Sequence, residues 1–268
     1  MQWSNKYGPW AVVTGASDGI GQQVAVESAK RGLNLLLVAR RLEVLERLAY
    51  ELASRHSVKI ETMGADLSNP GDVDFVMARA DSLEVGLLAA VAGYGTSGDF
   101  IALDGPRELN MVDVNCRAVV ALSHAFARRF AAQRRGGLIL MSSLVGFQGV
   151  PRAATYAATK AFIQTFAEGL RIELAPLGVD VLAAAPGPVR SGFEARANMK
   201  LAVAVSPSTV AREILNALGW KGTVRPGILS RVLETSLSPL PRRVRARIMG
   251  LVMRGMTKHQ DAKAALPA

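Results

Sequence analysis

Short aliphatic runs alternate with longer amphipathic segments along most of this chain. The short runs are rich in Val, Leu, Ile and Ala, which is typical of strands buried on both faces. They predict strands at residues 10–14, 33–38, 58–64, 87–92, 137–141 and 179–184. The segments between them repeat apolar residues at helical spacing and predict helices at 19–30, 42–55, 73–81, 107–132 and 156–177. This alternation predicts an α/β fold with a doubly wound parallel sheet, whose ligands bind beyond the carboxyl ends of the strands.

The composition is that of a globular protein. Half of the 268 residues are hydrophobic, which excludes disordered, collagen-like and coiled-coil classes. No linker, repeat or low-complexity stretch is visible, so we expect one domain, with a core at 1–227 and a helical extension of the same domain at 228–268. The single Cys116 and three dispersed His predict no metal site and no disulfide. With no signal peptide or membrane-spanning run, a cytoplasmic protein is expected.

Positive charge is concentrated in the last fifth of the chain. The net charge is +10, and residues 219–268 contain ten Lys and Arg but only two acidic residues. Trp220 is the one aromatic residue there, so no nucleic-acid partner is expected. Helices are predicted at 228–237 and 241–256. The second has an apolar face of Val244, Ile248, Leu251 and Val252, with arginines around it at positions 242, 243, 245, 247 and 254.

Two interpretations of this basic helix remain open. It caps a substrate cleft or contacts another subunit, with its arginines in solvent. Alternatively, it lies on an anionic membrane surface as a peripheral contact, as basic amphipathic helices do.

The first predicted strand runs directly into a glycine-rich turn, Thr-Gly-Ala-Ser-Asp-Gly-Ile-Gly, at residues 14–21. Glycines there permit positive φ and let backbone N–H groups approach a pyrophosphate, and the next helix adds its positive N-terminus. The turn resembles that of the short-chain dehydrogenase/reductase family, and the resemblance extends over about residues 7–225. It implies a Rossmann domain that binds a nicotinamide cofactor through Gly15, Ser17, Asp18, Gly19, Ile20 and Gly21.

Two arginines follow the second predicted strand. An NAD-binding protein usually has an acidic residue there for the ribose hydroxyls, whereas this chain has Arg40 and Arg41. A guanidinium pairs with a 2′-phosphate and stacks on adenine, so NADP(H) is predicted in preference to NAD(H). The alternative is that both arginines merely begin a solvated helix. Asp18 in the glycine turn also weighs against a nearby phosphate.

Three more segments match cofactor positions of the family. Asp66 and Leu67 follow the third strand, where the family contacts adenine. After the fourth strand the family has Asn-Asn-Ala-Gly, of which this chain keeps only Ala92 and Gly93. The loop after the sixth strand resembles the family's Pro-Gly-x-Val-x-Thr loop, which implies nicotinamide and pyrophosphate contacts from Pro186, Gly187, Val189 and Ser191.

Tyr156 and Lys160 are four residues apart in a predicted helix. That spacing places both side chains on one helix face, with Cβ atoms about 5–6 Å apart. A free phenol has a pKa near 10, and the ammonium together with an oxidised nicotinamide is expected to lower that of Tyr156. Tyr156 could then exchange a proton with a carbonyl or alcohol oxygen. Both residues are also expected to contact the cofactor.

Two further residues complete the family's catalytic tetrad. Ser143 ends the fifth strand and precedes Tyr156 by the spacing of the family, and its hydroxyl would donate to the substrate oxygen. Ser142 is expected to point elsewhere because side chains alternate along a strand. Asn115 matches the helix asparagine that holds a water beside the lysine, although a helix kink or cap would also explain it.

The motifs predict an NADP(H)-dependent oxidoreductase that reduces a carbonyl or oxidises a secondary alcohol. Residues 7–21 are similar to the branch that contains hydroxysteroid dehydrogenases and very-long-chain 3-ketoacyl reductases. A hydrophobic substrate, or an ordered lid, is indicated by Phe193, Ala195, Ala197, Met199, Leu201, Val203 and Val205. The resemblance implies a homodimer or homotetramer. The alternative function is a catalytically silent NADP(H)-binding sensor or scaffold.

Overall fold

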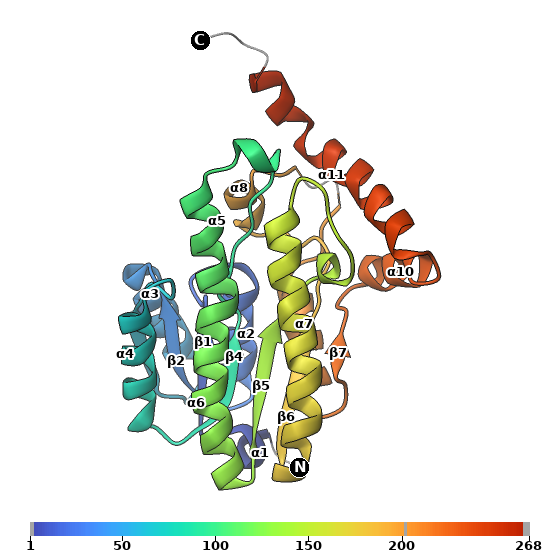
Figure 1. The fold of residues 1–268 in the computed structure, drawn as a ribbon. Helices are drawn as coiled ribbons and strands as arrows, with labels where there is room; N and C mark the ends of the chain where they lie inside the picture. The colour runs from blue at the N-terminus through green and yellow to red at the C-terminus, as the bar shows by residue number, and fades with distance from the viewer. Residues whose placement is uncertain (1–2, 201–202, 265–268) are drawn as a thin grey trace.

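One parallel sheet organises the computed structural model, which describes residues 3–200 and 203–264 (Figure 1). Its seven strands lie in the order β3-β2-β1-β4-β5-β6-β7, and every neighbouring pair is parallel. The predicted doubly wound fold is confirmed. The order reverses between β1 and β4, which is where such sheets form a ligand crevice. The strands are β1 (Trp10–Thr14), β2 (Asn34–Ala39), β3 (Ile60–Gly64), β4 (Val85–Ala90), β5 (Gly136–Met141), β6 (Val179–Ala184) and β7 (Thr223–Val224).

Strand boundaries follow backbone pairing more closely than hydrophobic pattern. The prediction at 58–64 begins too early, since β3 pairs with β2 only from Ile60. The prediction at 87–92 is shifted, because Val85 already pairs with Trp10. Strand β7 was not predicted, because its two residues are too short to show any periodicity.

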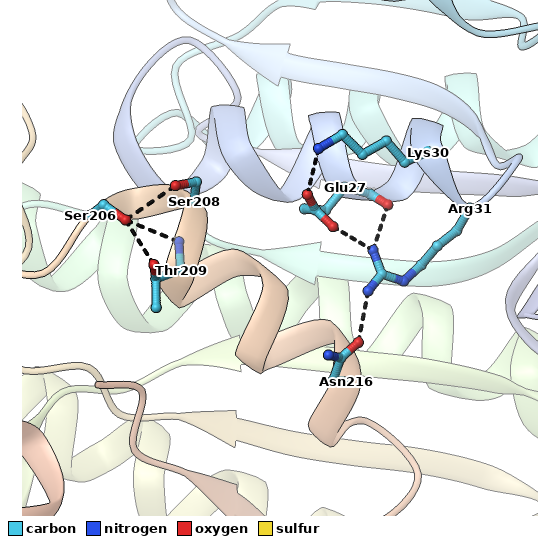
Figure 2. A network of polar contacts seen from close by, with 7 residues as sticks. All are labelled: Glu27, Lys30, Arg31, Ser206, Ser208, Thr209 and Asn216. Carbon is cyan, nitrogen blue, oxygen red and sulfur yellow. Dashed lines mark hydrogen bonds and ion pairs between the residues drawn. The ribbon is translucent and has the colours of Figure 1, made fainter. Parts of the chain in front are cut away.

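Helices α2 (Gly19–Lys30), α3 (Leu42–Arg55) and α9 (Pro207–Ala217) pack on one face of the sheet. Proline at its first position and the Ser206 hydroxyl, which accepts from Thr209 N at 3.2 Å, begin α9. Arg31 ties α2 to α9 by donating to Glu27 and to Asn216 Oδ1 at 2.8 Å each (Figure 2). The α9 segment was not predicted.

Helices α4 (Pro70–Asp81), α6 (Ala118–Gln133) and α7 (Ala154–Leu174) cover the other face. The single helix predicted at 107–132 is instead α5 (Gly105–Val112), a π-helical turn (Asp113–Arg117) and α6. Fully buried Phe126 and Phe130 of α6 pack in this layer. The inserted π turn re-aims the residues within it, and such turns are frequent at functional sites.

The remaining helices are short α1 (Trp3–Tyr7) and α8 (Phe193–Ala197), with α10 (Ile228–Leu237) and the long α11 (Arg242–Ala264). Figure 1 shows α11 crossing the end of the molecule where the strands point. Its packed face runs through Met249, Met253 and Met256. The predicted apolar face is confirmed in part: Ile248 and Val252 line a cavity, whereas Leu251 is 69% exposed. Among the described residues no helix is both long and apolar enough to cross a membrane.

Candidate active site

A cavity of about 480 Å³ lies beyond the carboxyl ends of the central strands. Its wall contains every predicted cofactor-binding and catalytic residue except Asn115. Segments 15–21, 38–41, 65–67, 91–94, 141–148 and 186–191 contribute to it, so the loops after six different strands converge there. Helix α11 covers the cavity with Met249, Met253 and Met256. The cleft-capping interpretation of this helix is therefore the one that its position supports.

The three glycines of the turn occupy positions that do not accommodate a side chain. Gly15 and Gly19 have φ values of +69° and +55°, which disfavour residues with a Cβ. A Cβ on Gly21 would lie 2.2 Å from the Gly15 carbonyl oxygen. The turn thus exposes bare backbone next to the start of α2, which is the arrangement that accommodates a pyrophosphate.

Asp18 in this turn is paired with a residue that the motifs did not indicate. Its Oδ2 lies 3.0 Å from Nη2 of Arg196 on α8. Both side chains line the cavity, and the ion pair offsets the negative charge that weighed against a phosphate. Arg196 was missed because it lies 178 residues away in sequence and in no motif.

Arg40 and Arg41 both lie on the cavity wall and are exposed. Arg41 Nη2 donates to the Ser17 carbonyl at 3.0 Å and to its hydroxyl at 3.2 Å, which holds the guanidinium against the glycine turn. Burial opposes ionisation of Asp66, but two hydrogen bonds from Ser68 and the Arg40 charge lower its pKa. The two arginines and Asp66 thus bracket one end of the cleft.

The loop after β4 lacks the two asparagines that the family has there, and other groups hold this loop in place. Thr14 Oγ1 accepts hydrogen bonds from the backbone N–H groups of Val91 and Ala92, both at 3.1 Å. A Cβ on Gly93 would meet Asn115 Oδ1 at 2.9 Å and Lys160 Nζ at 3.4 Å. The backbone at Gly93 therefore passes close to the Lys160 ammonium.

The loop after β6 returns to the glycine turn. Ser191 lies against Gly19, since a Cβ there would meet the Ser191 Cβ at 2.8 Å. Val189 bridges to Val205, and Gly187 N donates to the Ser230 hydroxyl of α10 at 3.0 Å. Of the predicted apolar lid, Phe193 and Met199 line the cavity, whereas Val203 is 64% exposed; Leu201 lies outside the described residues.

Tyr156 and Lys160 are both buried, with Lys160 Nζ 5.9 Å from the centre of the Tyr156 ring. Burial raises the pKa of Tyr156 to about 12, against an opposing hydrogen bond from Ser143. Burial likewise lowers the pKa of Lys160 to about 8. Within the polypeptide, desolvation favours the neutral form of both groups, and the lowering of the Tyr156 pKa by an oxidised nicotinamide stays a prediction.

Ser143 and Ser142 point to different places, as alternation predicts. Ser143 lies on the cavity wall, where its hydroxyl donates to Pro186 O at 3.4 Å. The Ser142 hydroxyl donates instead to the Lys160 carbonyl oxygen at 3.0 Å. It fixes the start of α7 relative to β5 and leaves Ser143 to face the phenol.

Asn115 is 1% exposed and lies behind the cavity wall. From the π-helical turn its amide accepts from Tyr94 N at 3.1 Å and donates to Tyr94 O at 2.9 Å and to Thr159 Oγ1 at 3.1 Å. The side chain thereby links the loop after β4 to α7. Lys160 Nζ in turn donates to Met141 O at 2.8 Å.

Residues beyond the motifs shape the other end of the cavity. The centres of the Phe193 and Tyr156 rings are 5.4 Å apart. Met253 packs in the same buried cluster. Arg245, expected in solvent, lines the cavity. Only the methionines at helical spacing could have indicated this face of α11, because nothing local marks a helix that folds back over a distant site.

Known proteins resemble the chain along most of its length. A family model described as short chain dehydrogenase matches residues 9–202. The 7beta-hydroxysteroid dehydrogenase of Clostridium sardiniense is 33% identical over 235 residues, which cover 86% of this chain and 90% of that protein. The very-long-chain 3-oxoacyl-CoA reductase of Aspergillus clavatus is 32% identical over 221 residues, covering 80% of this chain and 63% of that protein.

A solved structure gives the same result. The short-chain dehydrogenase from Sphingobium yanoikuyae in complex with NADPH is 29% identical, with a TM-score of 0.78, over 87% of this chain and 94% of that one. The branch predicted from the N-terminal motif is confirmed by the two curated relatives. The chain belongs to the short-chain dehydrogenase family.

Proposed function

We propose that this protein is an NADP(H)-dependent oxidoreductase that interconverts a carbonyl group and a secondary alcohol on an apolar substrate. The observation that carries the proposal is that Ser143, Tyr156, Lys160 and the glycine turn line one cleft. The cleft thus offers two hydroxyl groups, and a pair of such donors can stabilise the charge that develops on a carbonyl oxygen.

The cleft fits a dinucleotide. Bare backbone at Gly15 and Gly21 and the start of α2 suit the pyrophosphate, and Arg40 and Arg41 suit a 2′-phosphate. Asp66 and Leu67 would flank adenine, and the loop at 186–191 the nicotinamide. The bound nicotinamide supplies or accepts the hydride at the substrate carbon. The NADPH in the Sphingobium relative supports this choice of cofactor.

The side chains of the cleft supply the proton chemistry. The Tyr156 hydroxyl donates its proton to the substrate oxygen during reduction and accepts it during oxidation, while the Ser143 hydroxyl orients that oxygen. Lys160 in its ammonium form stabilises the phenolate that remains. Asn115 acts from behind as a positioning residue, holding the loop at Tyr94 against α7.

Apolar side chains surround the substrate end. Phe193, Met199, Met249 and Met253 pack with Tyr156 in one cluster, and methionine adapts to irregular apolar ligands. Both curated relatives act, by name, on hydroxysteroid or 3-oxoacyl compounds, which supports a large hydrophobic substrate. We propose that the protein assembles as a homodimer or homotetramer in the cytoplasm, as the family resemblance implies.

The proposal is tested by equilibrium binding of NADPH and NADH to the purified protein at one ionic strength. Tight NADPH binding with weak NADH binding, followed by turnover of apolar ketones, is expected. Preference for NADH would overturn the phosphate assignment. If cofactor binds but no carbonyl or alcohol reacts, the silent sensor replaces the enzyme, although nothing in the described cleft favours that alternative.

A further inference from the structure

Arg245 is a positively charged residue of the substrate cleft that has no acidic partner among the described residues. It lies in the first turns of α11 and lines the cavity. Its Nε is buried without a hydrogen-bond partner, and the guanidinium forms no ion pair with any described residue. The first turn of α11 contains no acidic residue. A partly buried cation without a counter-charge is unfavourable, so this position calls for an anion from outside the chain.

The acidic residues of the cleft cannot supply that anion. Among the described residues of the wall these are Asp18 and Asp66. Asp18 is paired with Arg196, and the Asp66 carboxylate is engaged by Ser68 and Arg40. Both lie at the end that suits the dinucleotide, whereas Arg245 belongs to the apolar wall formed by α11.

The helix itself gives the length of the ligand. Arg245, Met249 and Met253 succeed one another at intervals of four residues along one face of α11. Met253 packs in the cluster that contains Tyr156. At 1.5 Å per residue, Arg245 lies about 12 Å along the helix axis from Met253, and Met249 lies between them.

We propose that Arg245 is a specificity-determining residue that binds a carboxylate at the far end of an apolar substrate. This inference rests on the proposed oxidoreductase function. The substrate class is then an amphipathic keto or hydroxy acid, with an apolar body that spans about 12 Å between the reacting carbon and the carboxylate. The guanidinium offers the carboxylate two parallel hydrogen bonds.

The test compares 10-oxoundecanoate with its uncharged methyl ester. Each is titrated calorimetrically into protein saturated with NADP⁺, where the ketone cannot react, and each is assayed as a substrate with NADPH. Arg245→Met removes the charge and keeps an apolar stem. Arg247→Met is the matched control, because Arg247 is exposed two residues further on. Thermal midpoints establish that both variants fold.

We expect the wild type to bind the acid more tightly than the ester, and Arg245→Met to weaken acid binding about ten- to a hundredfold while leaving the ester within about twofold. Arg247→Met should change neither. Equal binding of acid and ester by the wild type, equal losses for both in Arg245→Met, or a loss of NADP⁺ affinity in that variant would each overturn the inference. If the acid binds through Arg245 but no ketone is reduced, the oxidoreductase proposal fails and the anion site stands.

Discussion

Asp18 of the glycine turn and Arg196 of α8 form an ion pair across the mouth of the cleft, with Oδ2 and Nη2 3.0 Å apart. Their side chains are 31% and 41% exposed, so the pair contributes little to stability, about 0–1 kcal/mol. Its consequence is electrostatic, since Asp18 lies in the turn proposed to hold the pyrophosphate. The pair also joins the cofactor end to the segment that contributes Phe193 to the substrate end.

Asp18→Asn is therefore expected to raise NADPH affinity, because it removes a negative charge near the phosphates and frees Arg196 to face them. The gain should be modest, about two- to tenfold, and should shrink at high salt. Titrations at low and high ionic strength measure it. Asp74→Asn, at an exposed site on α4, is the control; equal effects of both variants would contradict a local interaction.

Tyr156→Phe should abolish turnover and keep cofactor binding. The variant retains the ring that packs on Phe193 but loses the only proton proposed to reach the substrate oxygen, so kcat should fall about 10²- to 10⁴-fold. Tyr50→Phe, on a residue that is 79% exposed, should have no effect. Turnover within about tenfold of wild type in Tyr156→Phe would refute the proposed mechanism.

Arg41→Ala is expected to weaken NADPH binding more than NADH binding. Arg41 is already held against the turn by Ser17, so its charge is positioned for a 2′-phosphate. Loss of one charge-assisted contact should weaken NADPH binding about tenfold or more. Arg55→Ala, at the exposed end of α3, controls for net charge. An equal loss of affinity for NADPH and NADH would mean that Arg41 contacts a part of the dinucleotide that both cofactors share.

Lys160→Met should make the protein more stable at neutral pH although it disables the site. Burial lowers the pKa of Lys160 to about 8, while in the unfolded chain it is about 10.4. Between about pH 8 and about pH 10.4 the unfolded state binds more protons than the folded state, so Lys160 makes the stability of the wild type rise with pH across that window. Below about pH 8 the charged lysine therefore lowers the free energy of unfolding by about 1–3 kcal/mol. Replacing the lysine removes this penalty.

Denaturant unfolding at pH 7 and pH 10 tests the effect. The stability advantage of Lys160→Met should be large at pH 7 and small at pH 10, where wild-type Lys160 has lost its charge. Lys59→Met, at an exposed position, should show no such dependence. A variant less stable than wild type at pH 7 would mean that the hydrogen bond to Met141 O outweighs desolvation.

What the sequence could predict was local. The glycine turn and the Tyr156–Lys160 pair are set by spacing within one turn or helix, and both are where the motifs indicate. The pairing of Asp18 with Arg196, and the position of Arg245, depend on how α8 and α11 fold back over the strand ends. The hydrophobic periodicity of the sequence does not indicate which distant segments contact one another in this way. The predicted face of α11 included Leu251 and omitted the three methionines for the same reason, because its hydrophobic pattern is ambiguous without the cleft against which it packs.

Met253→Ala tests whether α11 is an integral wall of the cleft. Met253 is 3% exposed and packs with Val150, Ala153 and Tyr156, so truncation leaves a cavity in that cluster. The free energy of unfolding should fall by about 2–5 kcal/mol, the range for buried Met→Ala changes. Leu251→Ala on the exposed side of the same helix should alter it by no more than about 0.5 kcal/mol. Because Met253 lines the cavity and packs in the cluster that contains Tyr156, the truncation should also raise KM for apolar ketones more than it lowers kcat. If the two variants are equally stable, α11 detaches from the cleft in solution, and the substrate wall must be built from α8 and the loop after β5 alone.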